Sequence, residues 1–212
     1  MSAARERRIA EVVGAVVRQA LADRGATRIA LLDDGGPEAE LAARLLAMSL
    51  GAERVARITV SDAEMESVLH LAPAAGRERA GDEARRLRAR WTEGAVAAHP
   101  GNKTALLLGG ELPPEPLLPL ADLWATQVAE LAGGWSAPGP IRRLAELAGG
   151  IEALDAALRA WAERRDPSLI DALPGPAAEA VRTALATGRA SRLHPHIVPK
   201  IGTRTLGVDL FE

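Results

Sequence analysis

The residues best suited to chemistry lie in one short stretch, D-D-G-G-P-E-A-E, at positions 33–40. Two glycines between an apolar run and a helix-forming run leave backbone N–H groups available, and α/β proteins hold phosphate with such groups. The stretch is also acidic, with carboxylates at Asp33, Asp34, Glu38 and Glu40. Carboxylates could anchor Mg²⁺ beside a phosphate, but they also repel the phosphate itself. At about 4 Å and an effective dielectric constant of 20, that repulsion is of order 4 kcal/mol per pair of unit charges.

The acidic side chains also have a purely structural explanation. Asp and Glu near the first turn of a helix accept hydrogen bonds from its free N–H groups and favour the positive end of its dipole. The stretch taken alone therefore leaves two interpretations open, a phosphate loop or a strand–turn–helix junction with an acidic cap.

The composition removes several classes of function. The 212 residues suffice for one sizeable core, and we expect residues 1–212 to form a single domain. The absence of cysteine excludes disulfides and thiolate sites, and a net charge of −2 gives no electrostatic case for nucleic acid or an anionic membrane. No apolar run approaches the ~18 residues of a membrane span, and no signal peptide is evident. We therefore expect a cytoplasmic protein with no nucleic-acid or membrane partner.

Apolar runs and apolar positions at helical spacing alternate along the chain. The predicted strands are 28–33, the end of 51–61 after a turn, and 102–111. The predicted helices are 9–21, 37–50, 82–98, 120–134, 141–150, 151–165 and 176–188. The segment 62–81 and the tail from residue 194 have no clear period.

This alternation predicts an α/β fold, a three-layer doubly wound (Rossmann-like) parallel sheet of four to five strands with a helical C-terminal cap. Such sheets bind ligands beyond the carboxyl ends of their strands, at the point where the strand order reverses. Two exits from a predicted strand into glycines, at 34–36 and 109–110, are the candidate edge.

Several segments, in chain order, resemble the ammonia-dependent NAD+ synthetases of the PP-loop ATP pyrophosphatase superfamily. Residues 118–132, LPLADLWATQVAELA, are similar to the family's N-P-L-G-D-L-Y-K-T-Q-V. Residues 25–60 are similar to its strand, S-G-G-x-D-S loop, helix and second strand. LRARW (87–91) resembles A-R-x-R-M, and ALLLGGELPPE (105–115) stands where the family has L-V-L-G-T-G-N-K-S-E. The tail 191–209 is similar to the closing H-K-R-R-x-P-P…K…F-G-x-D.

The resemblance implies a homodimer that uses ATP and Mg²⁺ to adenylate the nicotinate carboxylate of deamido-NAD+, which ammonia then attacks. It implies a nucleotide loop made of Asp34, Gly35, Gly36, Glu38 and Ala39. It implies Mg²⁺ ligands at Glu38 and Glu115. On the dinucleotide side it implies Arg88, Asp122, Thr126, Arg192 and Lys200.

The chain departs from the family at the positions that carry the chemistry. The two serines of S-G-G-x-D-S are Asp34 and Ala39, its aspartate is Glu38, and the lysine of D-L-Y-K-T-Q-V is Ala125. We therefore expect a synthetase-like protein with a degenerate loop, catalytically impaired or inactive and at most a binder of adenine nucleotides. The alternative is an active divergent NAD+ synthetase, or a related ligase that adenylates a carboxylate and amidates it with ammonia.

Overall fold

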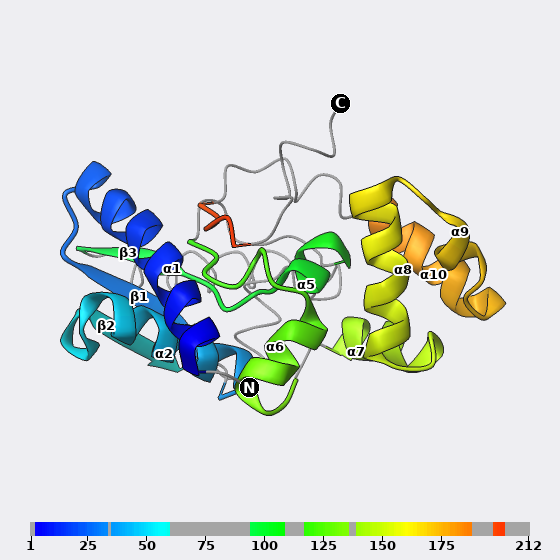
Figure 1. Cartoon of the computed structure of the whole chain (residues 1–212), viewed down its shortest axis with the longest axis horizontal. Coiled ribbons are helices and arrows are strands. Elements are labelled where there is room, and N and C mark those ends of the chain that lie inside the picture. The colour runs from blue at the N-terminus through cyan, green and yellow to red at the C-terminus, as the bar shows by residue number, and fades with distance from the viewer. Residues whose placement is uncertain are drawn as a thin grey trace, which may run out of the picture.

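The structure is a computed structural model that describes residues 3–33, 35–59, 94–108, 117–135, 139–187 and 197–201. A small sheet with its helices lies at one end of the molecule, and a group of helices lies at the other (Figure 1). Four predicted site residues lie outside the described residues: Asp34, Arg88, Glu115 and Arg192. The segment 60–93, the glycines at 109–110 and most of the tail also lie outside them.

The N-terminal part has the predicted strand and helices. Helix α1 (Ala3–Asp23) turns its apolar stripe inward and packs against α2 (Pro37–Leu50). The two helices approach closely at Gly14, where an added Cβ atom would lie 2.8 Å from the Cβ atom of Ser49. Between them in sequence, β1 (Arg28–Asp33) is buried from its second residue onward. A short 3-10 turn, η1 (Ala52–Arg54), leads into β2 (Val55–Thr59).

The described sheet is parallel, with the strand order β2-β1-β3, where β3 is Ala95–Ala98. Ile29 of β1 lies opposite Val55 on one side and Val96 on the other. Two isolated parallel bridges, Ala98 to Leu117 and Leu117 to Ile197, continue the sheet beyond β3. Since β2 and β3 flank β1 on opposite sides, the strand order reverses between β1 and β3. This confirms the Rossmann-like parallel sheet and puts the switch point at the carboxyl ends of those two strands.

Three predicted elements differ from the structure. Residues 95–98, predicted as the end of a helix, form β3. The predicted strand 102–111 is instead a helix, α5 (Lys103–Leu108), because its K-T-A-L-L-L run contains no Val or Ile and short apolar runs fit either structure. The predicted helix 120–134 is confined to α6 (Ala125–Ala132), which ends as expected at a glycine, Gly133, with φ 74°.

The C-terminal helices are confirmed as a cap. They are α7 (Gly139–Leu147), α8 (Ile151–Arg164), α9 (Ser168–Asp171) and α10 (Gly175–Thr187). Helix α9 follows Pro167 and is too short for its period to be read from the sequence. Figure 1 shows α8, α9 and α10 grouped on the side away from the sheet.

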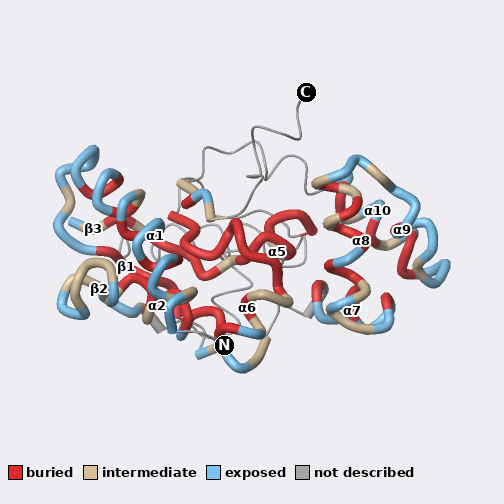
Figure 2. The backbone as a smooth tube through the Cα atoms, viewed as in Figure 1, coloured by how far each residue is buried: buried red, intermediate tan, exposed pale blue. Residues whose placement is uncertain are grey.

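Two apolar clusters hold these parts together. One joins α1, α2, β1, β3 and α6, and includes Val13, Leu31 and Leu45, each fully buried. The other joins the cap to Leu107 of α5 and to Trp124. Burying one such aliphatic side chain contributes about 1.5–3 kcal/mol. Figure 2 shows α5 and the described chain beside it as mostly buried. None of the described helices is long and apolar enough to cross a membrane.

Candidate functional site

The loop after β1 keeps the glycine backbone of a phosphate cradle. Gly35 has φ 75°, a left-handed backbone conformation that residues other than glycine rarely adopt. Gly36 is the N-cap residue of α2. The Gly35 N–H, however, donates to Oδ1 of Asp33 at 2.9 Å. A backbone donor that a bound phosphate would need is therefore already occupied by a carboxylate of the same loop.

Arg57 of β2 completes this internal arrangement. Its Nε lies 2.6 Å from Oδ2 of Asp33, and its Nη1 lies 2.8 Å from Oε2 of Glu40 on α2. The hydrogen bond from Arg57 lowers the pKa of Asp33, burial opposes that effect, and the Gly35 N–H adds to the lowering. The same carboxylate raises the pKa of Arg57. Asp33 therefore stays ionised, with its charge paired inside the protein.

Arg57 was not among the predicted site residues. Its only local signal is a basic residue within the strand V-A-R-I-T, and its partner Asp33 lies 24 residues away in the chain. Because the one positive charge of Arg57 offsets part of the negative charge of Asp33 and Glu40, the described part of the loop repels phosphate less than its acidic sequence predicts. The loop nevertheless has fewer backbone donors for phosphate, since the Gly35 N–H is bound by Asp33.

The described residues do not fit a Mg²⁺ site. Glu38 and Ala39, in the first turn of α2, are 5% and 0% exposed. Asp33 and Glu40 are engaged by Arg57. Within the described ranges, no three His, Asp or Glu side chains gather as they would around a metal ion. Glu115, the second proposed metal ligand, lies outside those ranges.

The chain leaving β3 forms the other side of the switch point. The segment from His99 to Thr104 runs directly from the strand into α5 and is almost entirely buried. Nδ1 of His99 accepts the Gly101 N–H at 3.0 Å. Oδ1 of Asn102 accepts the Ala105 N–H, also at 3.0 Å, and so caps the start of α5.

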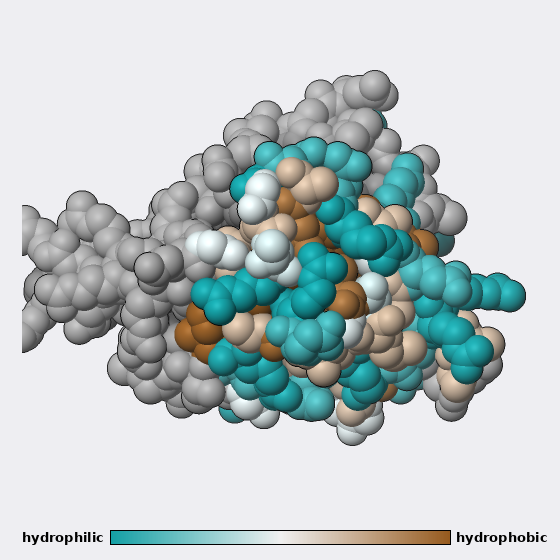
Figure 3. All heavy atoms as spheres, turned by 90° about the vertical axis from the view of Figure 1, so that its left-hand side faces the viewer, coloured by the Kyte–Doolittle hydropathy of each residue, from teal (hydrophilic) through white to brown (hydrophobic). Residues whose placement is uncertain are grey.

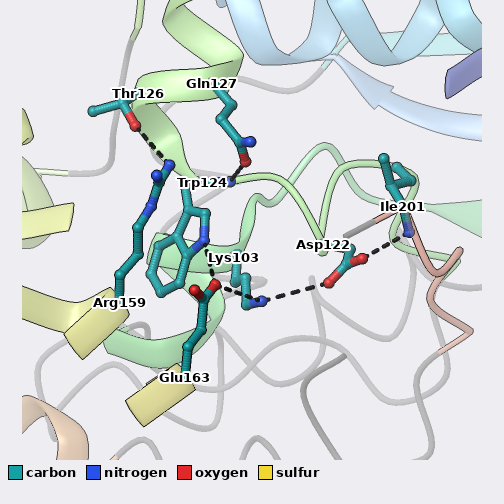
Figure 4. Close-up of polar contacts among 8 residues, drawn as sticks. All are labelled: Lys103, Asp122, Trp124, Thr126, Gln127, Arg159, Glu163 and Ile201. Atoms are coloured by element: carbon teal, nitrogen blue, oxygen red, sulfur yellow. Dashed lines mark hydrogen bonds and ion pairs between the residues drawn. The ribbon is translucent and has the colours of Figure 1, made fainter. Parts of the chain in front are cut away.

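Lys103, the first residue of α5, is the most deeply placed cation of the described part. Its side chain is 3% exposed, and its Nζ lies 3.5 Å from Oδ1 of Asp122 and 3.8 Å from Oε1 of Glu163 (Figure 4). Its Nζ also lies 5.0 Å from the centre of the Trp124 ring. Oδ2 of Asp122 accepts the Ile201 N–H at 2.7 Å. The ammonium is therefore held inside the protein by carboxylates and an aromatic face.

A second polar network closes the start of α6. Oγ1 of Thr104 donates to Oδ1 of Asp155 at 2.5 Å and accepts the Ala125 N–H at 2.9 Å. Oδ2 of Asp155 accepts the Thr126 N–H at 2.7 Å. Burial raises the pKa of Asp155, and the hydrogen bonds from Thr104 and Thr126 oppose that rise. The first N–H groups of α6 are thus bound by protein groups.

The structure brings some of the predicted dinucleotide-side residues close to one another. Asp122 binds Lys103, which lies over the Trp124 ring, and Thr126 accepts a hydrogen bond from Arg159, whose guanidinium lies 5.3 Å from the centre of that ring. Lys200 is exposed and makes no hydrogen bond or ion pair within the described residues. Ala125, which stands at the family's lysine position, is fully buried, so a longer side chain would have no open space there.

Comparison with known proteins supports the fold. No protein-family model matches the chain, and no curated protein matches its sequence. Among solved structures, an NH3-dependent NAD synthetase from Campylobacter jejuni in complex with the nitrate ion matches with a TM-score of 0.53 and 14% identity. The match covers 88% of this chain and 96% of the other. The likeness shows a shared fold.

The position of β3 is compatible with a second alignment for one of the motifs quoted above. The motif G-T-G-N-K-S-E of the synthetases was aligned above with residues after an expected strand, and the described strand β3 ends at Ala98, so H-P-G-N-K-T-A (99–105) is a second segment that resembles it. This alignment keeps Gly101, Asn102 and Lys103, and it puts Ala105 where the motif has glutamate. The alignment that gave Glu115 as a metal ligand assumed a strand at 102–111, and Lys103–Leu108 within that range form helix α5, whereas Glu115 itself lies outside the described residues.

Proposed function

We propose that this protein is an NAD synthetase-like α/β protein that has lost the synthetase reaction and binds at most an adenine nucleotide, weakly, at the carboxyl edge of its sheet. The single observation that carries the proposal is the position of the Asp33 carboxylate. It accepts the Gly35 N–H and pairs with Arg57, and so takes the place that a phosphate oxygen would need.

The other groups that the reaction would need support the same conclusion. The hydroxyl at the end of the loop is replaced by Ala39, and the lysine of α6 is replaced by the buried Ala125. Lys103 is held by Asp122 and Glu163, so it is not free to neutralise a leaving pyrophosphate. Catalytic groups that act together fail non-additively when one of them is lost.

An active ligase is the second candidate, and the G-N-K-T segment after β3 favours it. Asn102 and Lys103 survive from the family pattern at the switch point, where a nucleotide would bind. For activity, Lys103 would have to leave its ion pair with Asp122 and turn toward the ligand, and breaking a buried pair costs about 3–5 kcal/mol.

Calorimetric titration tests the proposal. The protein is titrated with ATP, AMP and adenosine, each with Mg²⁺ and with a chelator. We expect weak binding that does not increase with the number of phosphates, because the Asp33 carboxylate already binds the Gly35 N–H and Arg57. ATP binding at least about tenfold tighter than AMP in the chelator would contradict the proposal, since it would show a working phosphate cradle.

A further inference from the structure

Helix α8 turns a stripe of charged side chains toward the rest of the molecule. Asp155, Arg159 and Glu163 are spaced four residues apart, so these three residues, the α8 stripe, lie on one face of the helix. Figure 4 shows Arg159 and Glu163 reaching from α8 toward Trp124, which lies just before α6. Nε1 of Trp124 donates to Oε1 of Glu163 at 3.1 Å, and the same oxygen lies 3.8 Å from Nζ of Lys103. The cap therefore meets α5 and the start of α6 through polar contacts.

The apolar contact between the cap and the rest of the molecule is small. In the apolar cluster of the cap, the buried members that come from outside it are, among the described residues, Leu107, Leu108 and Trp124. The other apolar cluster lies inside the sheet end, and Figure 3, which views that end, shows hydrophobic residues in gaps between hydrophilic side chains. Each end thus has its own core, and little apolar surface joins the two.

The polar groups of this interface are imperfectly paired. Nε of Arg159 is buried and has no hydrogen-bond partner within the described residues. Burial raises the pKa of Asp155, so its charged form is less stable here than in water. A buried ion pair gains little over an apolar contact of the same size, and polar contacts between parts of a chain permit relative motion. Such an interface opens at a lower free energy than a packed apolar core.

The chain enters the cap through two consecutive glycines. Gly133 ends α6 with φ 74°, and Gly134 follows it ahead of α7. A Cβ atom at Gly134 would lie 3.7 Å from Pro37, its nearest contact apart from its chain neighbours. Because glycine has more backbone freedom than any other residue, this pair can absorb a rotation of the cap.

We propose that the cap, α7 to α10, is a hinged unit that docks on α5 and α6 through the α8 stripe and opens by rotation at Gly133 and Gly134. Opening separates Glu163 from Lys103 and exposes Trp124, so the α8 stripe controls access to the buried start of α5. The docked form is the major one. The motion is a property of the fold and requires no bound nucleotide.

Thiol labelling measures this opening, because the chain contains no cysteine. Leu107→Cys puts a thiol on α5 under the cap, and Leu45→Cys puts one in the equally buried core of the sheet end. Ile170→Cys puts one inside the cap, where α9 packs on α8 and α10. Alkylation by excess iodoacetamide, followed by mass spectrometry, tracks the population in which each thiol is exposed. We expect the Leu107→Cys thiol to react at least about tenfold faster than the other two.

Two results would overturn the proposal. If the Leu45→Cys thiol reacts as fast as the Leu107→Cys thiol, the molecule opens only by unfolding as a whole. If the Ile170→Cys thiol reacts as fast, the cap unfolds instead of rotating as a unit.

A pair of glutamates tests the α8 stripe in the Leu107→Cys protein. Glu163→Ala removes the contacts with Trp124 and Lys103, and should speed labelling at least about tenfold. Glu179→Ala removes the same charge at an exposed position of α10 and should leave the rate unchanged. Equal rates in the two variants would show that the α8 stripe does not hold the cap.

A pair of glycines tests the hinge in the same protein. Gly134→Ala should slow labelling about two- to fivefold, because alanine restricts the backbone of the open form. Gly175→Ala, at the start of α10, where a Cβ atom would meet nothing within 4 Å, should not slow it. Equal effects of the two substitutions would contradict a hinge at this position. None of these outcomes depends on whether the protein binds ATP.

Discussion

The Asp33 side chain binds groups on both sides of the glycine loop that follows β1. The loop after β1 retains the two glycines and the helix start, and the carboxylate of Asp33 binds both a loop N–H and the arginine of the neighbouring strand. One backbone donor of the loop and the neighbouring arginine are therefore bound by a group of the protein itself. An anion that enters must displace a carboxylate that is attached to the chain and so is present at very high effective concentration.

Removing Asp33 should improve anion binding. We expect Asp33→Ala to bind inorganic tripolyphosphate at least about tenfold more tightly than the unmodified protein, because it removes one negative charge and frees the Gly35 N–H and the Nε group of Arg57. Isothermal titration measures the change. Asp23→Ala, which removes the same charge at the exposed end of α1, is the control and should have no effect. If the two variants bind alike, the Asp33 carboxylate does not block the loop.

The lowered pKa of Asp33 should make the protein sensitive to acid. A carboxyl whose pKa is lower in the folded chain than its ordinary value of about 3.9 stabilises the fold above that value. This contribution is lost as the pH falls through the folded pKa, because protonation breaks the pair with Arg57. The free energy of unfolding, measured with urea, should therefore decrease more steeply between about pH 5 and pH 3 for the unmodified protein than for Asp33→Asn.

Asp155 does not affect that comparison. Its raised pKa acts in the opposite direction, since stability is lost as the pH rises through the folded value, and both proteins contain it. Parallel stability curves for the unmodified protein and Asp33→Asn would show that the pair with Arg57 adds nothing to the fold.

The elements around the switch point depend on Asp155. This residue of α8 binds the Thr104 hydroxyl of α5 and the Thr126 N–H of α6, and so fixes two helix starts against the cap. Asp155→Ala should lower the free energy of unfolding by about 2–4 kcal/mol, since it leaves buried donors without an acceptor. Asp171→Ala, which breaks the half-exposed pair with Arg182, should cost about 1 kcal/mol or less. Similar losses measured by denaturant unfolding would contradict the structural role of Asp155.

Secondary structure could be predicted where the local signals agree. Helix α2 was predicted from Pro37 to Leu50 because a proline marks its start and a glycine follows its end. The strand β1 was predicted from its fully apolar run. Helix α5 was predicted as a strand because a short run of Ala and Leu carries no period.

The site could be predicted only in part, because its decisive contacts are long-range. The glycines of the loop and Asp122 were identified from a resemblance. Arg57 and Asp155 were not, since their partners lie 24 and 51 residues away and only the fold brings them together. A sequence pattern indicates which face a residue lies on, and it does not specify its partner across the sheet.

For the whole molecule, we expect a homodimer whose interface is formed by α1 and α6. Val12 of α1 is 37% exposed, and an apolar surface on this helix would be costly to leave in water. Light scattering at micromolar concentration should give about twice 22.2 kDa. Val12→Asp should shift the protein toward monomer, whereas Leu169→Asp, at a 39% exposed position in α9, should not. A monomer at all concentrations would rule out this interface.

The measurement closest to the central claim is amide formation by the unmodified protein, with deamido-NAD+, Mg·ATP and ammonia as substrates. We expect no turnover above background, because Asp33 occupies the loop donor, Lys103 is held by Asp122, and a buried alanine replaces the lysine of α6. Loss of one electrostatic donor alone typically slows a reaction by about 10²–10³-fold. Turnover of about 1 s⁻¹, the lower limit of typical enzyme turnover numbers, would contradict the account and show that the acidic loop supports catalysis.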